Sequence, residues 1–275
     1  MKPFIFVPFC SLALVLAVVA VEACSSSSSD GGGAQTGLDA STGGGNTDGG
    51  GPGSSLVMCG PPPYITLGLV VEQASTTPNP PRIGGAVLTS ALCPDASFTS
   101  DDDGGIVGLV TKGVPFYGQF NASGYAPTLS PEENFAGDTS DVAIALPPSL
   151  LSAIIPNYDK TKTVIFLAVR KDTGTSHDGG ADCTDVSGVS VAVTGHPEAV
   201  VTYYTNDAIP AAMPAATSTS TGGSVSVTGI DVSASPVTVT ATKPGCTVTL
   251  LNGSATGRLP LENGYVSIAA AYLRN

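Results

Sequence analysis

The sequence predicts an all-β body, made of one or two small antiparallel β-sandwich domains, behind a disordered N-terminal tether. Three observations lead to this prediction. Glycine (34 residues) and proline (22) are abundant, while charged residues make up only 12% of the chain. Short segments of residues 56–275 alternate between apolar and polar side chains, which is the period of a half-buried strand. Residues 24–55 are mainly serine and glycine, so they bury too little apolar surface to offset the entropy of ordering.

Residues 1–23 have the order of a signal peptide. Lys2 precedes an apolar run at residues 4–21, and this charge-then-apolar order is typical of export signals. The alternative is a transmembrane helix, which needs about 20 apolar residues. The run is slightly short for a span and contains Pro8 and Ser11, so we expect a cleaved signal.

The sequence Val21-Glu22-Ala23-Cys24 resembles the bacterial lipobox, in which small and aliphatic residues precede a cysteine that receives lipid. Glu22 departs from that pattern, and cleavage by ordinary signal peptidase, giving a free secreted protein, is the alternative. The Ser/Gly linker at residues 24–55 favours lipid on Cys24. The position after Cys24 holds Ser25 rather than the aspartate that usually retains lipoproteins in the inner membrane. The resemblance therefore implies a bacterial outer-membrane lipoprotein, with its body on the periplasmic face or the cell surface.

The net charge of −12 limits the partners of the body. Nucleic-acid binding requires clustered Lys and Arg, and adhesion to anionic lipid requires the same. We expect no nucleic-acid partner, and contact with the membrane only through the N-terminal lipid.

The cysteines predict two disulfides. Cleavage removes Cys10, and lipid occupies Cys24. The four cysteines that remain are Cys59, Cys93, Cys183 and Cys246. An even number in an exported chain favours disulfides, with three connectivities to choose from. We predict Cys59–Cys93 and Cys183–Cys246, because each pair then stays inside one half of the chain. A metal site is the alternative, but the chain has no C-x-x-C spacing and only two histidines.

Residues 56–147 are predicted to form the first sandwich-like domain. A turn is expected at residues 101–105, where three aspartates precede two glycines. Phe116 and Phe120 are expected on one face of a strand, by the period of two. The expected strands are at residues 64–71, 85–92, 97–99, 106–111, 114–122 and 141–146.

One short helix is predicted at residues 148–156, between the two halves. Ser149 is expected to cap it and Pro156 to end it. Its apolar stripe is Leu150, Leu151, Ile154 and Ile155.

Residues 157–275 are predicted to form the second sandwich. The nearly continuous apolar run at residues 163–169 predicts a central, buried strand. Later segments alternate, which predicts an antiparallel sandwich with one solvent-exposed face per sheet. The inward-facing groups are Val189, Val191 and Val193; Val225 and Val227; Val237, Val239 and Ala241; Cys246, Val248 and Leu250; and Val266, Ile268 and Ala270. Cys246 shares a face with Val248, which suits an inter-sheet disulfide.

The two halves share a weak internal repeat of turn, strand, short turn and strand. It places residues 99–105, Val110, Phe120 and residues 122–125 of the first half against residues 219–223, Val227, Val239 and residues 243–246 of the second. The pattern of a known family is matched by residues 99–105 and Gly124-Tyr125 in the first copy, and by residues 188–191, 221–225 and 237–242 with Gly245-Cys246 in the second. Both copies resemble the carboxypeptidase regulatory-like domain, a transthyretin-like seven-stranded sandwich. The resemblance implies an accessory or surface module without catalytic residues. Immunoglobulin-like modules are the alternative, although their Cys…Trp…Cys core is missing because the chain has no Trp.

No catalytic or cofactor-binding motif occurs in the chain. The aspartates at residues 101–103 suit a solvated turn better than a calcium loop, because a glutamate at the far end is lacking. His177 lies among aspartates and glycines, which indicates a polar loop, although a metal or base role is the alternative. His196 precedes Pro197 and is expected in an exposed turn. Glu132 and Glu133 are adjacent, so on a strand they diverge.

Aromatic residues offer one candidate ligand platform. They are Phe116, Tyr117, Tyr203 and Tyr204, and core packing is the alternative reading. We therefore expect a non-enzymatic, lipid-anchored envelope module with a structural role or a protein or glycan partner, and no cofactor or metal. A carbohydrate-binding module and a hydrolase that depends on His177 or His196 are the alternatives.

Overall fold

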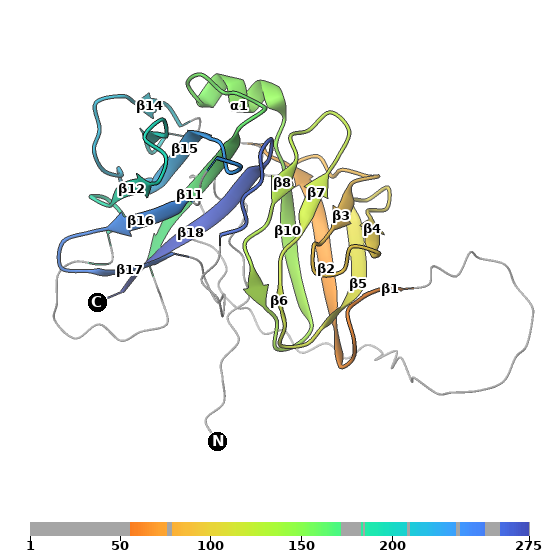
Figure 1. The fold of residues 1–275 in the computed structure, drawn as a ribbon. Helices are drawn as coiled ribbons and strands as arrows, with labels where there is room; N and C mark the ends of the chain where they lie inside the picture. Colours follow the sequence, from red (N-terminus) through yellow and green to blue (C-terminus); the bar gives the residue numbers. More distant parts are fainter. Residues whose placement is uncertain are drawn as a thin grey trace, which may run out of the picture. The chain divides into compact units, whose positions relative to one another are not determined.

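The computed structural model describes residues 56–75, 79–171, 183, 185–207, 210–234, 237–250 and 259–274. These residues are mostly strand with one short helix, so the all-β prediction is confirmed (Figure 1). None of the described helical residues forms a helix long and apolar enough to cross a membrane. The predicted signal at residues 1–23, the linker at residues 24–55 with Cys24, and the loop with His177 lie outside the described residues.

The first layer of the N-terminal half is a four-stranded sheet. Its order is β1 (Val57–Cys59), β5 (Gly105–Thr111), β2 (Tyr64–Gln73) and β10 (Thr139–Ala145). Strands β2 and β5 are antiparallel, but β1–β5 and β2–β10 are parallel. The sheet is therefore mixed rather than antiparallel, because β5 inserts between β1 and β2 and because β10 arrives only after the chain has crossed the opposite layer.

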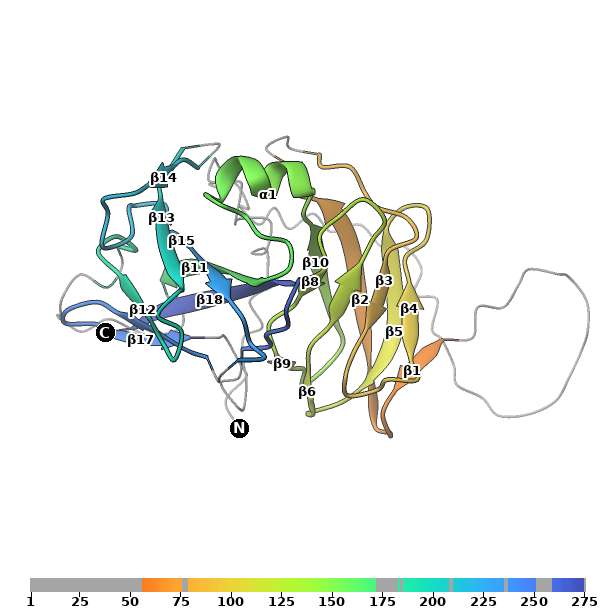
Figure 2. The same cartoon turned by 45° about the horizontal axis from the view of Figure 1, so that its top comes forward.

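The second layer of this half consists of four short strands in antiparallel pairs, β8 (Thr128–Leu129), β7 (Gln119–Asn121), β3 (Val87–Thr89) and β4 (Ser97–Thr99). Figure 2 shows the two layers. Buried side chains from both layers form one core, including Leu67, Leu88, Phe98, Ile106 and Val110.

Two predicted strands are shorter than expected. The segment 85–92 is a strand only at β3 (Val87–Thr89), because a turn begins at Ser90. The Cys93 N–H closes this turn by donating to the Ser90 carbonyl. The segment 114–122 divides into β6 (Pro115–Phe116) and β7, since the Gly118 N–H donates to Ser130 Oγ at 2.7 Å instead of continuing a ladder. Strand β6 pairs with β9 (Glu133–Asn134) in a separate two-stranded ladder.

The predicted helix is present as α1 (Pro148–Ile154). Pro147 occupies its N-cap position and no side chain caps it, so the expected cap by Ser149 is wrong; Ser149 already lies in the first turn. Leu151, Ile154 and Ile155 are buried, as the stripe predicts. They form a core cluster with Val164 and Phe166 of the following strand.

The C-terminal half is built around β11 (Thr163–Lys171), which lies between β15 (Ser224–Ile230) and β18 (Val266–Arg274). The prediction of a central, buried strand at residues 163–169 is confirmed. The sheet continues from β15 to β13 (Val200–Tyr204) and β14 (Ala212–Met213), while β17 (Thr247–Leu250) pairs with β18. A second, two-stranded sheet holds β12 (Ser190–Thr194) and β16 (Thr238–Thr242).

The expected alternation is present in β12, where Val191 is buried between the exposed Ser190 and Ala192. It fails in β15, where Ser224, Ser226 and Thr228 are buried along with the valines. The reason is that both faces of this sheet are covered. Ile165 and Leu167 of β11 pack into one core cluster, while Val164 and Phe166 pack with α1 into another.

Strand β18 joins the two halves. Val266 and Ser267 pair with Thr128 and Leu129 of β8. Strands of both halves therefore belong to one ten-stranded sheet. The division into domains at residues 56–147 and 157–275 stays a prediction.

Candidate functional site

An apolar pocket opens beside β10, at the edge of the four-stranded sheet. Its volume is about 50 Å³. One wall comes from β2 and β10, and the facing wall from β6, β7, β8 and the first residues of β18. The residues that line it are Leu67, Leu69, Phe116, Phe120, Thr128, Ser130, Pro131, Glu133, Phe135, Asp141, Val142, Ala143, Ile144 and Ile268.

Strand β10 directs the carboxylate of Asp141 into this pocket. In the parallel ladder Asp141 is paired with Leu69, and Ala143 with Val71. Partners in a ladder share one face of a sheet, and alternate residues along a strand share the same face. Asp141 therefore lies on the core-facing side with Ala143 and Ala145, both of which are buried.

Strand β9 supplies the second carboxylate. Glu133 pairs with Phe116 of β6, and both side chains line the pocket. The neighbouring Glu132 does not line it and is only 4% exposed. The two glutamates thus diverge, as expected, and the acidic pair is instead Glu133 with Asp141.

The pocket holds these two carboxylates in an unfavourable environment. Burial, followed by the negative charge of Asp141, raises the pKa of Glu133 from 4.5 to about 7. Burial also raises the pKa of Asp141, and the hydrogen bond that its Oδ1 accepts from the Val142 N–H at 2.7 Å offsets part of that effect. A desolvated carboxylate gains proton affinity because its charged form has lost water.

The other polar groups of the pocket are engaged within the protein. Ser130 Oγ accepts from the Gly118 N–H and donates to the Pro131 carbonyl at 3.1 Å. Thr128 Oγ1 donates to the Ala126 carbonyl at 3.2 Å. None of the lining residues, all of which the structure describes, is basic. The pocket therefore presents negative charge on apolar walls, an arrangement suited to a cation.

A metal ion is a poor fit for this charge. Calcium takes six to eight oxygen ligands, whereas the pocket offers two carboxylates and hydroxyls that are already bonded. Within the described ranges, no group of three or more His, Cys, Asp or Glu side chains is arranged to hold a metal.

The predicted aromatic platform is not formed. Phe116 lies in the pocket wall, and Tyr117 beside it is partly exposed. Tyr203 and Tyr204 are only 4% and 2% exposed. The hydroxyl of Tyr203 accepts from the Val191 N–H at 2.9 Å, and that of Tyr204 lies 2.8 Å from Ser226 Oγ. These two tyrosines are therefore core residues with satisfied hydroxyls and present no ring face to a glycan.

The expectation of an exposed His196 is also wrong. Its side chain is buried, and Nδ1 lies 2.7 Å from Glu198 Oε1. Strand β12 ends earlier, at Thr194, and in the turn that follows the histidine ring points inward while the Glu198 side chain remains exposed.

The aspartates at residues 101–103 form a turn. One carboxylate oxygen of Asp101 accepts from the N–H groups of Asp103 and Gly105, at 3.0 and 2.7 Å. This side-chain bonding closes the connection into β5.

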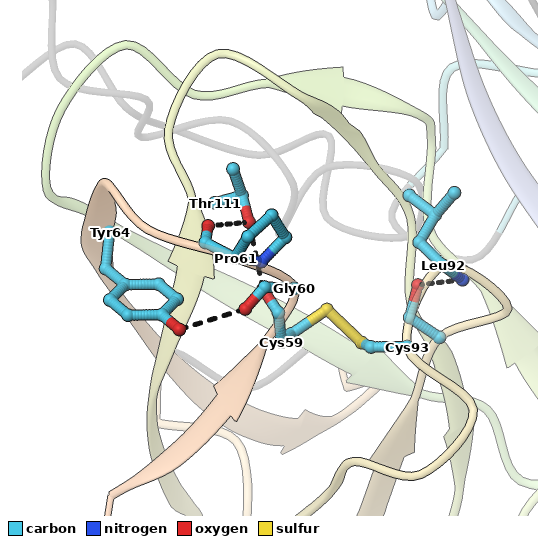
Figure 3. Close-up of a disulfide and its surroundings, with 8 residues drawn as sticks. Cys59, Gly60, Pro61, Tyr64, Leu92, Cys93 and Thr111 are labelled. Carbon is cyan, nitrogen blue, oxygen red and sulfur yellow. Dashed lines mark hydrogen bonds between the residues drawn. A yellow bond between two sulfur atoms is a disulfide. The ribbon is translucent and has the colours of Figure 1, made fainter.

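Both predicted disulfides are formed. Cys59 at the end of β1 bonds to Cys93 in the turn between β3 and β4, so this bridge connects the two layers of the N-terminal half (Figure 3). Next to it, Tyr64 donates to the Gly60 carbonyl at 3.0 Å and Thr111 to the Pro61 carbonyl at 2.6 Å. Cys183 bonds to Cys246 in the C-terminal half. Two disulfides indicate an extracytoplasmic protein.

Sequence reasoning missed the pairing of Glu133 with Asp141. A signal was present for Asp141, because the period of two places it on the same face as Ala143 and Ala145. A charged residue on an apolar strand face indicates either a partner or a site. No comparable signal marks Glu133, whose position depends on a two-residue ladder.

Comparisons with known proteins assign no family. No family model matches the chain, and no curated protein matches it. Among solved structures, it is distantly similar to the TIE protein of Bacillus anthracis (9% identity, TM-score 0.22, covering 76% of this chain and 34% of that one). It is equally distantly similar to the shaft pilin SpaA of Lactobacillus rhamnosus GG (10% identity, TM-score 0.22, covering 77% of this chain and 98% of that one). The same holds for the minor pilin GBS52 of Streptococcus agalactiae (11% identity, TM-score 0.20, covering 76% of this chain and 95% of that one). The chain thus spans about a third of the TIE protein chain. These TM-scores are too low to carry an argument about function.

Proposed function

We propose that this chain is a lipid-anchored, non-enzymatic β-sandwich module of a bacterial envelope, with a structural role or a binding role toward a protein or glycan partner. The observation that carries the proposal is the pair of disulfides, one in each half of the body. Disulfides persist in oxidising compartments, which agrees with export directed by residues 1–23. Lipid on Cys24 would hold the body at the outer membrane through the linker at residues 24–55.

The absence of catalysis is part of the proposal. It is supported by the sequence, which contains neither a Gly-x-Ser-x-Gly elbow nor an H-E-x-x-H pair. Membership of the carboxypeptidase regulatory-like family is likewise proposed from the sequence repeat alone.

The anchor is tested by membrane fractionation of cells that express the full chain. We expect the wild-type protein in the outer-membrane fraction and Cys24→Ser in the soluble or unprocessed fraction, since the serine cannot accept lipid. Cys10→Ser is the matched control, because it changes a cysteine in the apolar run without touching the acceptor. Equal distribution of the wild type and Cys24→Ser would contradict the proposed anchor.

A further inference from the structure

The carboxylates of Glu133 and Asp141 lie in the same pocket without a basic residue in its lining. Buried charges in proteins are normally paired, because an unpaired charge keeps the full cost of its desolvation. The pair is coupled, since the charge of Asp141 acts on Glu133. When both carboxylates are ionised, a positive charge in the pocket would offset their desolvation and their mutual repulsion.

The dimensions of the pocket restrict which cation fits. A volume of about 50 Å³ is well below the roughly 150 Å³ that accommodates a benzene ring. The pocket therefore takes the end of a chain rather than a whole ligand, so an ammonium group and its nearest methylenes would enter it while the rest of the ligand stays outside. The walls that such a chain would contact are apolar, formed by Leu67, Leu69, Phe116, Phe120 and Ile268.

We infer that this pocket binds a primary ammonium group carried on an unbranched alkyl chain, with Glu133 and Asp141 as its counter-ions. An ammonium is a compact point charge with three donors, which suits two carboxylates that line one pocket. The methylenes behind it suit the leucine and phenylalanine walls. A lysine side chain of a protein partner and a free alkylamine share this chemistry. The inference rests on the binding role proposed above, but it does not depend on lipid at Cys24.

Binding is expected to strengthen as the pH rises. The ammonium binds the ionised form of Glu133, whose pKa is raised to about 7. About one tenth of the ionised form is present one unit below such a pKa and about nine tenths one unit above it. The one titratable group that faces Glu133 from the lining residues is Asp141 on β10, because β2, β6, β7, β8 and β18 contribute only uncharged side chains there.

The test is a titration of the full chain with n-butylammonium, followed by methyl NMR of Ile144 and Ile268, which line the pocket. We expect saturable shifts of both methyl signals at about pH 8 and roughly tenfold weaker binding at about pH 6. n-Butanol and butyrate, which keep the chain but lack the positive charge, are expected to cause no saturable shift.

Two variants and a control make the test specific. Glu133→Gln and Asp141→Asn keep the side-chain shape, and each is expected to weaken binding by about tenfold, the value of one charge-assisted contact. Glu133→Gln should also abolish the pH dependence. Asp102→Asn removes the same charge from an exposed turn and should leave binding unchanged.

The outcomes are separable. Binding of N-acetyl-lysine methylamide as well as n-butylammonium identifies a lysine side chain as a suitable ligand, and binding of n-butylammonium alone identifies a free alkylamine. Equal shifts with n-butanol, or no saturable shift with any ammonium, would overturn the inference. The fractionation of Cys24→Ser is independent of this result, so failure of one proposal is distinguishable from failure of the other.

Discussion

At the scale of single residues, Glu133 has the most unusual electrostatic environment that bears on function. Its folded-state pKa of about 7 exceeds the ordinary value of 4.5. The folded protein therefore holds a proton on this group more tightly than the unfolded chain does. Between about pH 4.5 and 7, the contribution of Glu133 to the free energy of unfolding falls as the pH rises. At neutral pH and above, the ionised Glu133 in the empty pocket lowers the free energy of unfolding of the protein.

We predict that Glu133→Gln stabilises the protein at about pH 8 by roughly 2 to 3 kcal/mol, because the amide carries no desolvated charge. At about pH 3 the variant and the wild type should be nearly equal, since Glu133 is then almost fully protonated in both states. Urea denaturation at the two pH values measures the difference. Asp102→Asn is the control, and a stability gain for Glu133→Gln that does not vary with pH would contradict this account.

The residue scale also shows where sequence reasoning reaches its limit. The cysteine pairing could be inferred because each bridge closes within one half of the chain. The burial of Tyr203, Tyr204 and His196 could not, because a tyrosine or histidine suits both core and surface. Which environment it occupies depends on partners far away in sequence, such as Val191 for Tyr203.

At the scale of elements, close packing between the two layers of the N-terminal half depends on glycine. A Cβ atom added at Gly108 of β5 would lie 2.1 Å from Phe98 Cε1 and 2.4 Å from Phe98 Cδ1. Phe98 is itself only 2% exposed, so it has little room to move. The Phe98 ring, on β4, thus fills the space that a side chain at position 108 would occupy.

We predict that Gly108→Ala destabilises the protein by about 2 kcal/mol, within the range for overpacking of a core. Gly137→Ala is the matched control, because a Cβ added there meets no atom within 4 Å. Thermal or urea denaturation of both variants measures the effect. A loss for Gly137→Ala as large as that for Gly108→Ala would show that the contact with Phe98 is not the cause.

Strands with strong periodicity were predictable from sequence. The segments 64–71, 106–111 and 163–169 correspond to β2, β5 and β11, because their apolar pattern matches the faces they bury. The interruption at Gly118 was not predictable, since it depends on the distant Ser130. Parallel pairing of β10 with β2 was not predictable either, because the period of a strand is the same whichever way its neighbour runs.

At the scale of the whole molecule, the chain combines a proposed N-terminal lipid anchor with a disulfide-linked body. Cys59–Cys93 closes a separation of 34 residues and Cys183–Cys246 one of 63. In the loop-closure model, each bridge of this length stabilises the fold by about 4 kcal/mol. Such support suits a body whose sheets are built from many short strands and that is proposed to reside outside the cytoplasm.

The measurement that tests the central claim most directly is the intact mass of the native protein recovered from membranes, before and after reduction. We predict a chain that begins at an acylated Cys24 and gains four hydrogens on reduction, two for each disulfide. An unmodified N-terminus, or a mass that does not change on reduction, would contradict the account of a lipid-anchored, disulfide-linked envelope module.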